Sequence, residues 1–256
     1  MNRRELLLFL ASSGCIYCRK SAAESSYPEN HADENSLRPH STDGDELAYG
    51  CYLKLDSHGY GPSGINNTMP QLYNTCGISA VDHGLKIEHE LLSRYYDVSS
   101  GFAFFNDSMA PNAFATPTPI DALGSDTDGA VLFGVTLTRS LRQRFGDNAI
   151  VLVAAHEFGH ICQYKNGIEP RPGKGLELCA DFLAGWYLAS KGNDHLNGHS
   201  LAKGIFSVGD YAFNLPTHHG TPAERVSALR AGVIKGNNGL SVDDALAYGA
   251  RRYLGA

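Results

Sequence analysis

Residues 147–164 limit the fold more than any other stretch, because an unbroken apolar run there leads directly into two histidines. Ile, Val, Leu, Val, Ala and Ala occupy positions 150–155, and His156-Glu157-Phe158-Gly159-His160 follows. Gly146 precedes this run and a loop rich in Pro and Gly follows it, so we expect a helix over 147–164 with Asp147 as its cap. A helix this apolar must be surrounded by other elements, which predicts a domain built around it.

The rest of the chain predicts an α+β domain with a small β-sheet. With 256 residues, 43% of them hydrophobic, the chain has enough apolar material for one packed domain, which we place at residues 47–256. Helical spacing and breakers predict further helices over 78–98, 175–191 and from Thr221-Pro222 to 231. Runs of β-favouring residues predict strands over 102–105, 112–116 and 130–137.

The N-terminus has the pattern of an export signal. Arg3 and Arg4 precede a short apolar run, and Ser21-Ala22-Ala23 suits signal peptidase, so residues 1–23 are interpreted as a signal peptide of twin-arginine type. The alternatives are a lipoprotein signal with a lipid anchor at Cys15, and a cytoplasmic protein whose first helix is merely apolar. The run is too short for a permanent transmembrane anchor, and the polar segment 24–46 predicts a flexible arm. We therefore expect an exported, periplasmic or cell-envelope protein.

Charge indicates which partners the protein can bind, and the cysteines indicate which disulfide could form. A net charge of −6 and a pI near 6.0 argue against a nucleic-acid partner, which requires a concentrated surplus of Lys and Arg. Of six cysteines, Cys51 and Cys76 are the expected disulfide pair in an oxidising compartment. Cys162 and Cys179 each lie two residues from a candidate metal ligand, about 200° away around a helix, and are interpreted as packing residues.

His156 and His160 fit the pattern H-E-x-x-H, which has a chemical meaning on a helix. Residues four apart lie on one face, so both imidazoles can hold one Zn²⁺. Glu157 lies beside the ligand line and can act as general base toward a metal-bound water. The alternative is a pair of buried histidines bonded to carbonyl groups.

A catalytic zinc normally takes three protein ligands, and Glu177 is the candidate for the third. It follows His160 by 17 residues, which leaves room for a loop and a return helix. Asp181, one turn further on the same face, can accept a hydrogen bond from a ligand histidine. The alternative is a solvated acidic face, but the surrounding apolar residues indicate a buried helix whose acids need partners.

These two segments resemble a known group of enzymes. Residues 154–163 and 176–186 are similar to the helices of bacterial neutral zinc metallopeptidases, which are gluzincins, and of peptidase family M48. The resemblance covers about residues 110–232 and includes Asn112-Ala113-Phe114-Ala115 and the run from His219 to Arg225. It implies a zincin-like fold, one zinc ion per chain and a peptide or protein substrate.

Two further candidate residues have ordinary alternatives. His219 is the candidate donor to the developing oxyanion, or else a surface histidine. Arg225 can pair with Asp181, or else is an exposed helix arginine. His83 and His89 are interpreted as surface or packing histidines. If residues 112–116 form an exposed edge strand, an extended peptide can add to it.

The sequence therefore predicts a zinc-dependent peptidase of zincin-like α+β fold. A rival enzyme activity is hydrolysis of a non-peptide amide or ester at the same metal. A rival of another class is a catalytically inactive zinc-binding scaffold or interaction module of the cell envelope. A third alternative is an envelope protein whose histidines bind no metal.

Overall fold

The computed structural model of the protein describes residues 48–49, 52–53, 70–108, 111–170, 173–192 and 220–255. The described elements all belong to one compact unit, Asp45–Ala256. The predicted signal peptide 1–23 and flexible arm 24–46 lie outside the described residues, as does His219. None of the described helices is long and apolar enough to cross a membrane.

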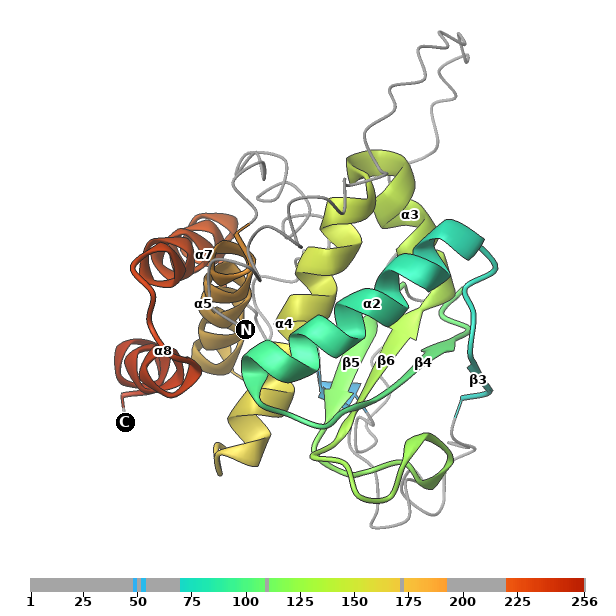
Figure 1. Ribbon diagram of the computed structural model, residues 1–256, viewed down its shortest axis with the longest axis horizontal. Coiled ribbons are helices and arrows are strands. Elements are labelled where there is room, and N and C mark those ends of the chain that lie inside the picture. Colours follow the sequence, from blue (N-terminus) through green and yellow to red (C-terminus); the bar gives the residue numbers. More distant parts are fainter. Residues whose placement is uncertain are drawn as a thin grey trace, which may run out of the picture. The chain divides into compact units, whose positions relative to one another are not determined.

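A mixed β-sheet forms one layer of the unit (Figure 1). Its strands are β1 Ala48–Tyr49, β2 Tyr52–Leu53, β3 Leu72–Tyr73, β4 Gly101–Phe105, β5 Ala113–Thr116 and β6 Ala130–Gly134. Their order in space is β1-β2-β5-β6-β4-β3. β4 and β6 are parallel over their whole length, whereas β5 is antiparallel to β6. The expected α+β class with a small sheet is confirmed.

Alternation along the strands gives the sheet two apolar faces. Phe104 of β4 and Phe133 of β6 join the main core, which also contains residues of helices α2 Ser79–Tyr96 and α4 Asp147–Lys165. Ala103 and Leu132 point to the other face and pack with Ile120, on the connection between β5 and β6. Helices therefore cover one face of the sheet, and this connection covers the other.

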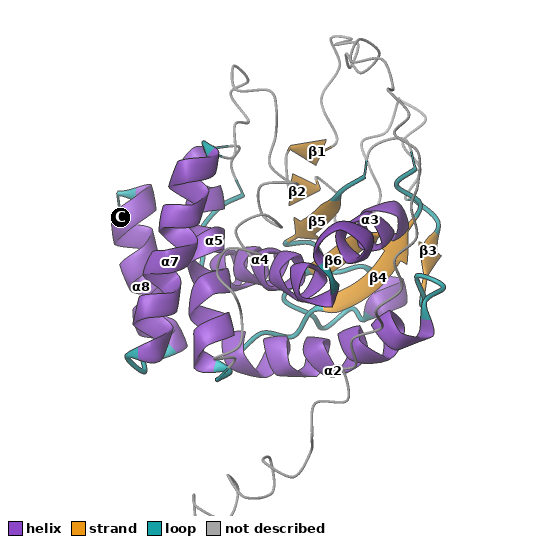
Figure 2. Ribbon diagram, turned by 90° about the horizontal axis from the view of Figure 1, so that it is seen from above, coloured by secondary structure: helices purple, strands orange, loops and turns teal. Residues whose placement is uncertain are grey.

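The helix predicted from the apolar run is α4, and it is enclosed on all sides. Every residue of positions 152–164 is buried, and α4 contacts α2, α3 Val135–Phe145, α5 Lys174–Ser190 and the strands β5 and β6 (Figure 2). A helix without a solvent face can carry polar side chains only where partners meet them. The two histidines and the glutamate of α4 must therefore meet polar or charged partners inside the unit.

A helical layer lies on the far side of α4 from the sheet (Figure 1). It consists of α5, α7 Pro222–Asn237, α8 Val242–Gly249 and the π-helical turn η2 Ala250–Leu254. α5 packs between α4 and α7. α7 begins with a capping box, in which Thr221 Oγ1 accepts from Glu224 N and Glu224 Oε2 accepts from Thr221 N at 2.8 Å. The sequence predicts the start of α7 correctly, whereas α8 and η2 were not predicted.

The predicted strand 130–137 is too long. β6 ends at Gly134 and α3 begins at Val135. Asp107 explains the change, because its buried carboxylate accepts from Thr136 N at 2.6 Å and from Leu137 N at 2.9 Å. These are backbone N–H groups that the first turn of a helix leaves unpaired. A distant residue therefore caps α3, although the β-branched local sequence favours a strand.

The predicted edge strand 112–116 is also corrected. β5 pairs with β6 on one side and, through Tyr52 and Ala115, with β2 on the other. β5 is therefore an interior strand of the sheet. An extended peptide cannot add to it at Ala115 as the sequence suggested.

Two smaller expectations are wrong as well. Asp147 is the first residue of α4 and not its cap; Gly146 occupies the cap position, and Asp147 pairs with Arg142 Nε at 3.0 Å. Cys76 is a free, buried cysteine, so the expected disulfide with Cys51 is not formed. Cys162 and Cys179 are free and buried in the core, as their packing role requires.

Candidate metal centre

α4 and α5 bring three potential metal ligands to one point. His156 and His160 lie on α4, Glu177 lies in the first turn of α5, and all three are buried. The two histidine Nε2 atoms are 3.2 Å apart. Glu177 Oε2 lies 3.2 Å from His156 Nε2, and Glu177 Oε1 lies 3.6 Å from His160 Nε2. The predicted third residue therefore does meet the two histidines, although it comes from another helix.

These separations suit a small tetrahedral cation. With metal–ligand distances of about 2.0–2.1 Å, two ligands of tetrahedral zinc are about 3.3–3.4 Å apart. The three observed separations lie within about 0.3 Å of that value. The three residues therefore form a group that could hold a metal ion.

His156 is oriented by a carboxylate behind it. Its Nδ1 lies 2.9 Å from Asp181 Oδ1. Asp181 is fully buried and accepts two hydrogen bonds from Arg225, from Nε and from Nη2, each at 2.8 Å. Both contacts that the sequence suggested for Asp181 are thus present, and the fork of Arg225 offsets the buried charge.

These contacts shift the pKa values of Asp181 and His156. Burial raises the pKa of Asp181, but Arg225 and the hydrogen bonds to it outweigh burial and hold that pKa below its usual value. Burial likewise lowers the pKa of His156, but the carboxylates of Asp181 and then Glu177 raise it to about 10. A cation is therefore strongly favoured between these groups, either as a proton or as a metal ion.

His160 has a different partner, which the sequence reasoning missed. Its Nδ1 lies 2.8 Å from Gln163 Oε1, and Gln163 Nε2 donates to Leu176 O at 3.1 Å. Gln163 follows His160 by three residues, so both lie on one helix face. That spacing is the signal for this contact in the sequence.

Close approach of α4 and α5 depends on Gly159. A Cβ at this position would lie 3.3 Å from Ala180 O and 3.4 Å from Leu183 Cβ. A glycine here therefore lets the two ligand-bearing helices pack closely. Glu157 is 1% exposed, between the two histidines on α4.

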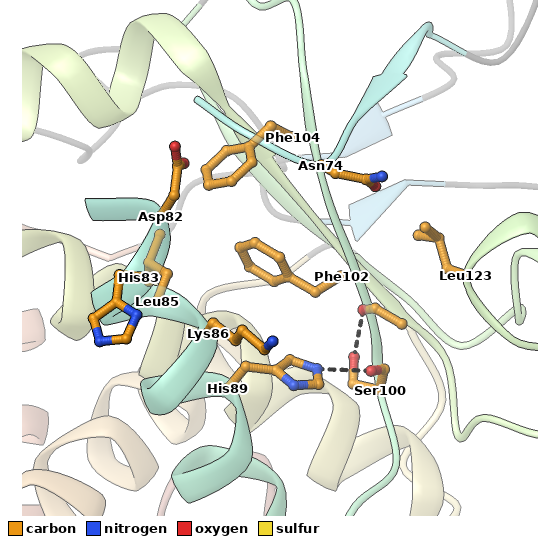
Figure 3. Close-up of a pocket in the computed structure, with 11 residues that line it drawn as sticks. Asn74, Asp82, His83, Leu85, Lys86, His89, Ser100, Phe102, Phe104 and Leu123 are labelled. Carbon is orange, nitrogen blue, oxygen red and sulfur yellow. Dashed lines mark hydrogen bonds between the residues drawn. The ribbon is translucent and has the colours of Figure 1, made fainter. Parts of the chain in front are cut away.

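A pocket of about 540 Å³ is lined by residues of α2 and β4 (Figure 3). His83, Lys86, Phe102 and Leu123 are among its lining residues. His89, at its base, is hydrogen-bonded to Ser100 O through Nε2 at 2.8 Å, and its ring packs edge-on against Phe158 with centroids 5.4 Å apart. His89 is therefore a packing histidine, and His83 is an exposed one, as the sequence indicated.

Comparison with known proteins leaves interpretation to this geometry. No family model, no curated protein and no solved structure matches the chain. The arrangement itself comprises two histidines and one carboxylate converging on a cation site, with a buried glutamate between the histidines in sequence. This donor set is the one that catalytic zinc takes in hydrolases with a His₂Glu site.

Proposed function

We propose that the protein is a zinc-dependent peptidase of gluzincin type with a zincin-like fold. The observation that carries the proposal is the convergence of two Nε2 atoms and one carboxylate within 3.2–3.6 Å. Both Nδ1 atoms are bonded to acceptors outside the cluster, so whenever both rings are neutral their Nε2 lone pairs face one another and Glu177. Three facing acceptors repel unless a cation lies among them.

Each residue then has a definite role. His156, His160 and Glu177 would hold the metal, and Asp181 with Arg225 orients His156. Bound zinc would lower the pKa of a coordinated water toward about 7 and polarise a carbonyl group. Glu157 would be the general base that accepts a proton from the nucleophile and returns it to the leaving amine. His219 is the proposed oxyanion donor and lies outside the described residues.

One observation favours the alternative of a zinc-binding scaffold without turnover. β2 pairs with β5 at Ala115, which is the strand to which an extended substrate was expected to add. Under this alternative the metal holds α4 and α5 together and the unit serves as an interaction module. Catalysis and scaffold differ in what Glu157 does, because only catalysis needs a base beside the metal.

The test begins with the zinc content of the purified protein and of Glu177→Ala. One zinc per chain in the wild type, and little in the variant, supports the three-ligand site. The zinc-loaded protein is then incubated with a mixed peptide library beside Glu157→Gln, a nearly isosteric variant that keeps all three ligands. Cleavage by the wild type alone supports the peptidase. Equal zinc in the wild type and Glu157→Gln, with no cleavage by either, supports the scaffold. No zinc in folded wild type rejects both the peptidase and the scaffold.

A further inference from the structure

Gln163 is fully buried beside the metal-ligand cluster and contacts both helices that supply ligands. One end of its amide lies 2.8 Å from Nδ1 of His160 on α4. The other end lies 3.1 Å from the carbonyl oxygen of Leu176, which directly precedes Glu177 on α5.

The hydrogen-bond chemistry of these groups fixes the orientation of the Gln163 amide and the tautomer of a neutral His160 ring. A backbone carbonyl can only accept, so the end of Gln163 that faces Leu176 must be the NH₂ group. Oε1 then faces His160 and must accept, which places the proton of His160 on Nδ1. Nε2 of His160 is consequently left with its lone pair directed toward His156 and Glu177.

We infer that Gln163 is a positioning residue for the metal site, which fixes the tautomer of His160 and ties it to the helix segment that carries Glu177. The inference rests on the proposed metal centre. The two histidines are thus supported differently: His156 by a carboxylate that Arg225 neutralises, and His160 by a neutral amide. A neutral partner adds no charge that would require a second buried arginine.

A purely structural role, as a link between α4 and α5, is the alternative that an experiment must exclude. Two variants separate the roles, because they retain different halves of the contact. Gln163→Glu keeps an acceptor for His160 but cannot donate to Leu176 O. Gln163→Met has a similar length and keeps neither. A positioning role requires the acceptor, whereas a structural link requires the donor.

The experiment measures zinc affinity by competition with a chromophoric chelator, together with the visible absorption spectrum of the cobalt-substituted proteins. We expect Gln163→Met to bind zinc 10–100-fold more weakly than the wild type, with altered cobalt bands. Gln163→Glu should bind zinc within about threefold of the wild type and keep the cobalt bands. Urea unfolding of the metal-free proteins measures the loss of stability separately. We expect the free energy of unfolding to be lower in both variants than in the wild type.

Three outcomes would overturn the inference. One is wild-type zinc affinity and an unchanged cobalt spectrum in Gln163→Met. Another is a folded Gln163→Glu that binds zinc as weakly as Gln163→Met, or tenfold more weakly than wild type where Gln163→Met does not fold. The third is a wild type that binds no metal, which also rejects the proposed function. If the affinities follow the expected order but no peptide is cleaved, the peptidase fails while the role of Gln163 stands.

Discussion

The contact between Asp181 and Arg225 shows how a single buried pair supports the site. Removal of one partner leaves the other charge buried without this ion pair, and breaking a buried pair typically costs about 3–5 kcal/mol. We expect Asp181→Asn and Arg225→Met each to lower the free energy of unfolding of the metal-free protein by about that amount. The double variant should lose about 1–3 kcal/mol less than the two single losses combined. Urea unfolding of all four proteins measures this coupling, and strictly additive losses would contradict the pairing.

The thiols are a second test at the residue scale. Burial raises the pKa of Cys162 to about 12, and the pKa values of Cys76 and Cys179 to about 11. At pH 8 these groups are thiols, and only the thiolate reacts with iodoacetamide. We expect no alkylation of the three in folded protein and complete alkylation in urea, as located by peptide mass analysis. Rapid labelling of Cys162 or Cys179 in the native protein would show that the core around the ligand helices is open.

At the scale of helices, glycines allow α5 and α7 to approach each other closely. A Cβ on Gly232 would overlap the carbonyl oxygen of Phe182, whereas a Cβ on Gly84 of α2 would meet nothing within 4 Å. Alanine in a helix interior is favoured over glycine by about 0.5–1 kcal/mol, but overpacking costs about 1–3 kcal/mol or more. We expect Gly84→Ala to stabilise the protein and Gly232→Ala to destabilise it, as measured by thermal unfolding. If Gly232→Ala stabilised the protein, α7 would have to lie further from α5 than the structure shows.

The first turn of α3 depends on a cap from another part of the chain. Asp107 accepts from Thr136 N, Leu137 N and Asn112 N. We expect Asp107→Ala to lower the free energy of unfolding by about 2–4 kcal/mol, because these buried N–H groups lose a charged acceptor. The exposed Asp126 offers a control, and Asp126→Ala should change stability by less than about 0.5 kcal/mol. Equal effects of the two substitutions in urea unfolding would contradict the capping role.

These elements also show what the sequence could and could not predict. α4 and α5 were predictable because an apolar run, breakers and ligand spacing are all local, and the meeting of Glu177 with the histidines followed from metal chemistry. α3 was not predictable, since its cap, Asp107, comes from the loop after β4. The pairing of β2 with β5 joins Tyr52 to Ala115, and no local pattern encodes it. Gln163 was missed because amide side chains carry no charge that demands a partner.

For the whole molecule, the candidate metal site lies between helices that the sheet alone does not hold together. α5 contacts α4 and α7, and the Nε2 atoms of His156 and His160 meet the Glu177 carboxylate where α4 meets α5. Without a cation or proton at that point, burial of these groups opposes the packing around it. Metal binding should therefore stabilise the entire compact unit and not only the two helices that carry the ligands.

Thermal unfolding with and without zinc measures this coupling. A ligand that binds only the folded state at 1,000 times its Kd stabilises it by about 4 kcal/mol, which corresponds to roughly 8–16 °C in Tm for a domain of this size. We expect Tm to rise by that amount when zinc is added to chelator-treated protein, in one cooperative transition. Glu177→Ala should respond by less than half as much, because two imidazoles alone bind zinc weakly. A zinc-independent Tm in the wild type would mean that the cluster is occupied by a proton, and His156 would then be a charged partner of Asp181 and Glu177.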